Sequence, residues 1–171
     1  MSLLDRARSF MGGHGVTVRH VAIEGGEPAA ASLTLADAGV RGELAVACDK
    51  PCTLLSRRTE VVLELRHADG HTEQVVIGRQ LAPLPAVPPD APPETAPDAP
   101  PDAPATYPYE LAAGAEVLDT FDVVFDGSLE AILAQRRLVP GGDIRFFLRT
   151  LVDVKGSPFD PEVIDELPLR P

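Results

Sequence analysis

DIRFFLRTLVDV, residues 143–154, is the stretch that decides the fold class, because its apolar side chains recur at every second position. Such a period of two is typical of a β-strand that buries one face and exposes the other. An amphipathic helix would instead repeat its apolar residues every three or four positions. The stretch therefore predicts a long strand, and the residues expected to face the core are Ile144, Phe146, Leu148, Thr150, Val152 and Val154.

The same alternation recurs along most of the chain, in short segments separated by breaks rich in Gly, Pro, Asp and Ala. Five segments precede a proline-rich region and four follow it, so the sequence predicts an all-β protein. The segments are VTVRHVAI (16–23), ASLTL (31–35), GELAVAC (42–48), EVVLEL (60–65), EQVVIG (73–78), YPYEL (107–111), VLDTFDVVF (117–125), DIRFFLRTLVDV (143–154) and VIDELPL (163–169).

Two of these segments also predict which side chains face inward. In residues 117–125, Phe121, Val123 and Phe125 share the inward phase. Residues 67–71 contain Asp-Gly, a favoured hairpin turn, after a segment with one apolar and one largely polar face. In that segment Val61, Leu63 and Leu65 are expected inside, and Glu60, Val62, Glu64 and Arg66 are expected on a wet face.

Two short helices are also predicted. Leu3, Leu4, Ala7, Phe10 and Met11 repeat at helical spacing and stop at two glycines, and we expect this N-terminal helix to pack on its own domain. Anchoring of this helix to a membrane surface is the alternative. In the second helix, Ser128 is the expected N-cap, Leu129, Ile132 and Leu133 form the apolar stripe, and Pro140-Gly141-Gly142 ends it.

PAVPPDAPPETAPDAPPDAPA, residues 85–105, interrupts the alternating segments. The strands on either side are too few for separate sandwiches but together fill two sheets, so we expect one domain, residues 1–171. Residues 83–106 are then a disordered loop inside that domain. The PDAP repeats at 89–92, 97–100 and 101–104 have PxxP spacing but no basic neighbour, which favours a spacer over a docking motif.

Length and charge narrow the functional classes. The chain has 171 residues, 44 % of them hydrophobic, which suffices for one core. Its formal net charge is −11, and its arginines come in pairs at most (Arg57 with Arg58, Arg136 with Arg137), so nucleic acid is not an expected partner. No run of about 18 apolar residues predicts a membrane span. The start, MSLLDRARSF, lacks a secretory apolar run, which favours the cytoplasm.

Cys48 and Cys52 flank a turn that contains Pro51. They are too few for a disulfide framework, and their spacing is not that of a redox CxxC motif. We expect two free, largely buried thiols. A disulfide between them and a metal site with two further ligands are the alternatives.

The remaining candidate residues point to no catalytic set. His67 and His71 flank the hairpin turn, where two imidazoles can share a metal, but solvated hairpin ends are the favoured reading. His14 and His20 look isolated, and no histidine is placed by sequence to activate Ser157. No nucleophile elbow, phosphate loop or zinc motif occurs, so neither an enzyme nor a cofactor is expected. Asp119, Asp122, Asp153, Asp160 and Asp165 are expected to cover the wet face of the sheets.

Three segments share features with one known family: LRTLVDVKGSPFDPEVIDELPLRP (148–171), YELAAG (109–114) followed by Phe121 and Phe125, and GVRGELAV (39–46). They resemble segments of the bacterial sporulation-control proteins, which are relatives of the arrestins. The likeness extends to the first domain of that family only, and the proline-rich segment is foreign to it. It implies an arrestin-like, immunoglobulin-like two-sheet β-sandwich with a regulatory or scaffolding role and no chemistry.

The sequence thus predicts a cytoplasmic interaction module that acts through protein partners. We expect contact at an exposed sheet edge or at the hairpin end, residues 66–72, and the acidic surface favours partners with basic residues. A weak homo-oligomer stays open. A structural or envelope-associated module of the immunoglobulin type is the main alternative, and a hydrolase with an unrecognised site is a further one.

Overall fold

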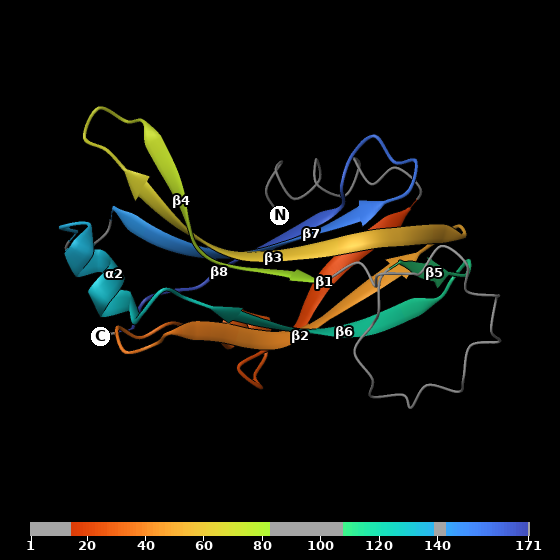
Figure 1. The fold of residues 1–171 in the computed structure, drawn as a ribbon, viewed down its shortest axis with the longest axis horizontal. Helices are drawn as coiled ribbons and strands as arrows, with labels where there is room; N and C mark the ends of the chain where they lie inside the picture. The colour runs from red at the N-terminus through yellow and green to blue at the C-terminus, as the bar shows by residue number, and fades with distance from the viewer. Residues whose placement is uncertain (1–14, 83–107, 139–142, 171) are drawn as a thin grey trace, which may run out of the picture.

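The computed structural model describes residues 15–82, 108–138 and 143–170 of the chain. Two antiparallel sheets pack face to face (Figure 1). One has the strand order β1-β2-β6, and the five-stranded sheet has the order β4-β3-β7-β8 with β5 paired to β3. The elements are β1 (Val16–Ile23), η1 (Pro28–Ala30), β2 (Gly39–Cys48), β3 (Cys52–Arg66), β4 (Thr72–Ala82), β5 (Tyr109–Leu111), β6 (Glu116–Val124), α2 (Leu129–Gln135), β7 (Ile144–Val154) and β8 (Glu162–Glu166).

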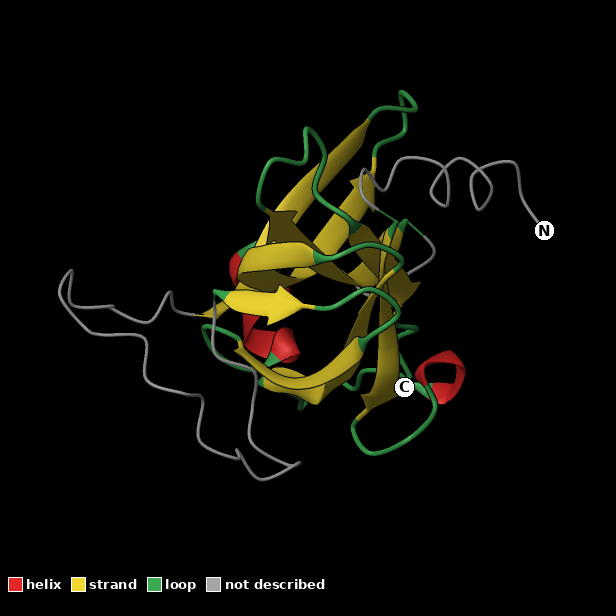
Figure 2. Cartoon of the chain, turned by 90° about the vertical axis from the view of Figure 1, so that its right-hand side faces the viewer, coloured by secondary structure: helices red, strands yellow, loops and turns green. Residues whose placement is uncertain are grey.

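The predicted all-β sandwich is confirmed. Strands that precede the proline-rich segment pair directly with strands that follow it, β2 with β6 and β3 with both β5 and β7. The proline-rich loop and the N-terminal helix of the sequence prediction lie outside the described residues. Figure 2 shows the two layers end-on, with α2 at the far end of the sandwich and η1 to one side.

The inward phase predicted for β7 and β6 is confirmed. Phe146, Leu148 and Thr150 are almost fully buried, whereas their neighbour Phe147 is only half-buried on the opposite face. In β6, Phe121, Val123 and Phe125 are buried, the last just beyond the end of the strand. These side chains and those of β2 and β3 form one core between the sheets.

The wet face predicted for β3 is wrong at two positions, because Glu60 and Val62 are buried, at 1 % and 3 % exposure. β3 is a central strand, with β4 on one side and β7 on the other. Long side chains of those two strands cover Glu60, and Val62 lies in register between Val76 and Phe147. The outer face of β3 is therefore shielded here by the side chains of its two neighbouring strands.

Residues 31–35 do not form the predicted strand. Leu33 makes an isolated parallel bridge with Leu169, and the rest of the segment is unpaired. The Asp37 carboxylate accepts a hydrogen bond from the Thr34 backbone N–H at 2.7 Å, which closes a turn. Such local side-chain bonding competes with the ladder of a sheet, so the alternation there was misleading.

The second predicted helix is confirmed over a shorter length. Ser128 Oγ accepts a hydrogen bond from the Ala131 N–H, and the stripe of Leu129, Ile132 and Leu133 is buried. The helix ends at Gln135, before the predicted Pro-Gly-Gly stop, and Arg137 follows with a φ of 58°. Within the described residues, no helix is long and apolar enough to cross a membrane.

Candidate functional site

A network of hydrogen-bonded polar side chains crosses the core from one side of the sandwich to the other. At its first end, His20 of β1 is buried, and its Nδ1 lies 2.6 Å from the Asp165 carboxylate of β8. Its Nε2 lies 3.0 Å from Thr150 Oγ1 of β7. His20 therefore joins the edge strands of the two sheets, and the expectation that it is isolated is wrong.

The hydrogen-bond network continues from Thr150 to Thr59, and the hydroxyl oxygens of these two residues are 3.0 Å apart. Arg57 then donates from Nη1 to Thr59 Oγ1 at 2.7 Å and from Nε to the Asp119 carboxylate at 2.8 Å. Its Nη2 also donates to the Thr120 carbonyl at 2.9 Å. Arg57 and Asp119 thus form a buried ion pair between the two sheets, which holds β3 against β6.

Two of the five aspartates expected on the wet face therefore belong to this interior hydrogen-bond network. Asp119 is 3 % exposed, and Asp165 binds His20. Asp122, Asp153 and Asp160 are exposed, as expected. The sequence carried one signal for Asp119, since it shares the odd-numbered inward phase of Phe121 and Val123. A carboxylate in an inward phase needs a buried cation, and Arg57 is that cation.

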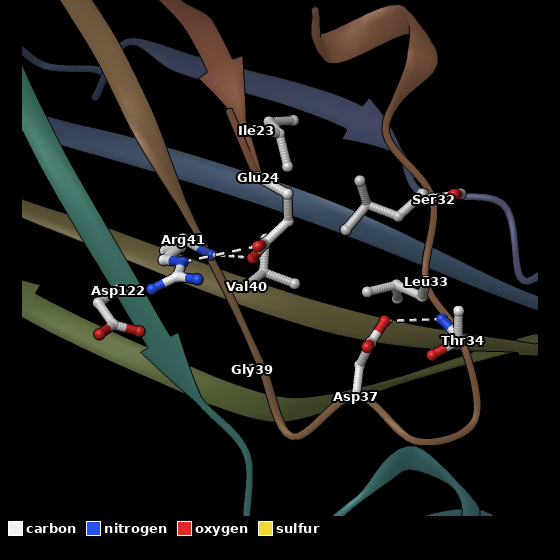
Figure 3. A pocket seen from close by; sticks show the side chains of 11 residues that line it. Ile23, Glu24, Ser32, Leu33, Thr34, Asp37, Gly39, Val40, Arg41 and Asp122 are labelled. Carbon is white, nitrogen blue, oxygen red and sulfur yellow. Dashed lines mark hydrogen bonds and ion pairs between the residues drawn. The ribbon is translucent and has the colours of Figure 1, made fainter. Parts of the chain in front are cut away.

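A polar pocket of about 430 Å³ lies where the η1 loop passes the ends of β1 and β2 (Figure 3). Glu24 accepts from the Arg41 backbone N–H at 2.9 Å and lies 3.6 Å from its guanidinium. The Asp37 carboxylate accepts from the Thr34 N–H, so Asp37 closes its own loop, whereas Glu24 ties the turn after β1 to β2. Figure 3 shows Asp122 beside Arg41 at the rim. Ile23, Leu33, Val40 and Leu167 are the buried apolar residues of the lining.

The described residues of this pocket supply polar groups that can bind a ligand, but they do not place a nucleophile beside a base. Among the described residues that line it, the only hydroxyls are those of Ser32 and Thr34, and none is a histidine. Ser157 lies elsewhere, on the turn after β7, where its hydroxyl donates to the Phe159 carbonyl at 2.6 Å. The arrangement suits a small polar ligand better than a reaction that needs proton transfer.

The β3–β4 hairpin end brings His67 and His71 together. Their rings stack at 4.0 Å between centroids, and each is tied to a neighbouring carboxylate, His67 to Glu73 at 3.3 Å and His71 to Asp69 at 2.9 Å. Hydrogen bonds from the side chain and backbone of His71 lower the pKa of Asp69. In the part of the chain that the structure describes, no group of three His, Cys, Asp or Glu side chains is arranged to hold a metal.

The two cysteines are free thiols, as predicted, with Cys48 buried and Cys52 half-buried. The Cys48 Sγ–H points to the Ala112 carbonyl at 3.1 Å. Burial, followed by a hydrogen bond with Cys48 and its charge, raises the pKa of Cys52 to about 11. Cys52 is therefore a poor nucleophile at neutral pH, because little of it is thiolate.

A second charged cluster lies on the outer face of the five-stranded sheet, around the buried Glu60. Arg149 Nη2 donates to its carboxylate at 2.5 Å and Arg79 Nε at 2.7 Å, and Arg58 Nε lies 3.4 Å away. Burial by itself raises the pKa of Glu60, but the hydrogen bond and charge of Arg149 and the charges of Arg79 and Arg58 outweigh it and lower the pKa. Glu60 is thus ionised among three cations.

Comparison with known proteins supports the fold. The crystal structure of Spo0M, a sporulation control protein from Bacillus subtilis, is similar with a TM-score of 0.58 and 12 % identity, over 92 % of this chain and 50 % of that one. The chain thus spans about half the length of that structure. An alkylpurine DNA glycosylase from Pseudomonas fluorescens bound to abasic DNA has a TM-score of only 0.35 at 12 % identity, over 95 % of this chain and 33 % of that one, and carries no argument. No family model and no curated protein matches the sequence.

Proposed function

We propose that this chain is a non-enzymatic regulatory or scaffolding protein that acts in the cytoplasm by binding a protein partner. The observation that carries the proposal is the edge strand β4. In the described part of the chain, one side of β4 pairs with β3, and its other side meets only an isolated bridge between Gly78 and Phe125. Residues 72–77 therefore offer backbone N–H and C=O groups with which a partner strand can pair.

The hairpin end supplies side chains for specificity next to this edge. In Figure 1 the tip between β3 and β4 rises away from the rest of the sandwich, so a partner can reach it. Thr72, Glu73 and Gln74 are exposed along the first part of β4. The formal net charge of −11 favours basic residues on a partner that meets this end of the molecule.

The fold supports the same class of function. Spo0M is described as a sporulation control protein, and its likeness to this chain extends over nearly all of the chain. A regulatory role of that kind needs a binding surface and no catalytic site. The pocket near Glu24 and Asp37 does not favour a hydrolase, since both carboxylates accept hydrogen bonds from backbone N–H groups, Glu24 from Arg41 of β2 and Asp37 from Thr34 of its own loop.

The test is a pair of proline variants, Gln74→Pro and Val75→Pro. Successive N–H groups of a strand point to opposite edges, so one proline removes an outward N–H and the other removes an N–H that pairs with β3. The variant that keeps the wild-type Tm is the one that loses only the outward N–H, and it is called the edge variant below. Partners crosslinked in the native host and identified by mass spectrometry are expected with the wild type and lost with the edge variant.

Recovery of the same partners by the edge variant would remove β4 from the proposal. Turnover of a hydrolase or transferase substrate, abolished by Glu24→Gln or Asp37→Asn in the polar pocket, would overturn the binding function itself.

A further inference from the structure

The arginine cluster around Glu60 is a local exception in an acidic protein. Three guanidinium groups surround one carboxylate, so the cluster carries two positive charges more than Glu60 neutralises. The chain as a whole has a formal net charge of −11. A concentration of like cations around a buried site is unfavourable unless anions compensate it, and Glu60 compensates only one of the three arginines.

Hydrogen bonding in the cluster is also incomplete. Within the described residues, the buried side-chain nitrogen and oxygen atoms that lack a hydrogen-bond partner are Arg58 Nε and Arg149 Nε. The Arg58, Arg79 and Arg149 side chains as a whole are 43 %, 49 % and 27 % exposed, so a ligand can reach the cluster although these two Nε atoms are buried. Guanidinium groups bind carboxylates through two parallel hydrogen bonds. Among the described residues, the terminal nitrogens of Arg58 and Arg79 make no hydrogen bond, which leaves them for such a pair.

A small hollow with a mixed lining adjoins the cluster on the same face. Its volume is about 120 Å³, and its lining combines the apolar side chains of Val62, Phe147 and Ile164 with the polar ones of Glu64, Gln74 and Arg149. The strand registers make the two features continuous, because Arg149 lies opposite Glu60 on one side and Ile164 on the other. A ligand that bears a carboxylate beside an apolar side chain therefore fits both.

Acidic side chains limit the kind of ligand that this face accepts. Glu64 lines the hollow, and Glu162 and Glu166 of β8 lie opposite Leu151 and Phe147 of β7. A nucleic acid or an anionic membrane would place further negative charge against these carboxylates, which repel it. A short segment with one or two well-placed carboxylates avoids that repulsion.

We propose that the outer face of the five-stranded sheet binds an acidic, partly apolar peptide segment of a partner protein. One carboxylate of that segment sits among Arg58, Arg79 and Arg149, and an adjacent apolar side chain enters the hollow beside Phe147. The inference rests on the proposed function, because it states the chemistry of a partner that the chain binds.

The test uses a fluorescein-labelled peptide of about ten residues, with two Glu residues among Val and Ser, and a matched peptide with Gln in place of Glu. Fluorescence anisotropy is expected to show binding of the Glu peptide that weakens as salt rises, and far weaker binding of the Gln peptide. Arg79→Gln should lower the affinity for the Glu peptide about tenfold. Arg19→Gln, which removes the same charge from an exposed arginine of the smaller sheet, should change it less than about twofold.

Glu60→Gln gives an independent readout in the opposite direction. It removes the carboxylate that competes with the ligand, so the affinity for the Glu peptide should rise about tenfold. The Tm of each variant verifies that it is folded. A rise in affinity cannot result from unfolding, which keeps the proposal testable even if an arginine variant is unstable.

Three results would overturn the inference. They are equal binding of the Glu and Gln peptides, equal losses in Arg79→Gln and Arg19→Gln, and binding of a single-stranded oligonucleotide or of phosphatidylserine vesicles in preference to the Glu peptide. A dimer of this chain that Arg79→Gln dissociates would overturn it as well. Loss of peptide binding in the β4 edge variant alone would leave the proposed function standing and remove this site.

Discussion

The two faces of the five-stranded sheet handle buried charge in different ways. On the inner face, Arg57 pairs one to one with Asp119. Its other donors form hydrogen bonds to Thr59, to the Thr120 carbonyl and to the Gln80 side chain. On the outer face, Glu60 meets three arginines, and two of their Nε atoms have no hydrogen bond. A balanced, saturated pair holds a structure together, whereas an unbalanced, unsaturated cluster retains capacity for a ligand.

The largest effect is expected when the inner pair is broken. Arg57→Leu leaves the Asp119 carboxylate buried without its cation, so the free energy of unfolding should fall by about 3 to 5 kcal/mol. Urea denaturation of the variant and the wild type measures this change in the free energy of unfolding. The double variant Arg57→Leu/Asp119→Leu should recover much of the loss, because no uncompensated charge then remains in the core. A single variant as stable as the wild type would show that this pair does not hold the sheets together.

Two neighbouring phenylalanines of β7 compare the inner and outer faces of the sheet for apolar side chains. Phe146 is 1 % exposed in the core, whereas Phe147 is half-buried on the outer face. Phe146→Ala should lower the free energy of unfolding by about 3 to 5 kcal/mol, and Phe147→Ala by about 2 kcal/mol less than that. Thermal unfolding of the two variants compares them directly. Equal losses would mean that a second layer covers the outer face.

A smaller effect is expected for the outer cluster. Glu60→Gln removes the carboxylate partner of three arginines, but those side chains reach solvent, so the loss of stability should be only about 1 to 2 kcal/mol. Chemical denaturation of Glu60→Gln beside Arg57→Leu tests the contrast. A loss as large as that of Arg57→Leu would make the outer cluster a structural element like the inner one.

The smallest effect is a pH dependence that belongs to Glu60. Because the folded protein lowers its pKa from the ordinary value of 4.5, the stability it contributes is present above that pH and is lost as the pH falls through the folded pKa. The difference in free energy of unfolding between the wild type and Glu60→Gln should therefore shrink below about pH 4.5. Urea titrations from neutral to acidic pH measure it, and a difference independent of pH would contradict the ionised state of Glu60.

Local pattern in the sequence determined the fold class and most of the core. The period of two in residues 143–154 and 117–125 identified Phe146, Leu148, Phe121 and Val123 as buried, because neighbouring side chains of a strand point to opposite faces whatever the strand pairs with. Ser128 and the apolar stripe after it identified the second helix for the same local reason.

Only the tertiary structure decided which polar residues meet. His20 and Asp165 are 145 positions apart, Arg57 and Asp119 are 62 apart, and Glu60 and Arg149 are 89 apart. Alternation tells which face a side chain is on, but the charge that it meets depends on strand order and register. Glu60 alternates like a surface residue and is buried because β3 lies between β4 and β7, a fact of topology that no local pattern contains.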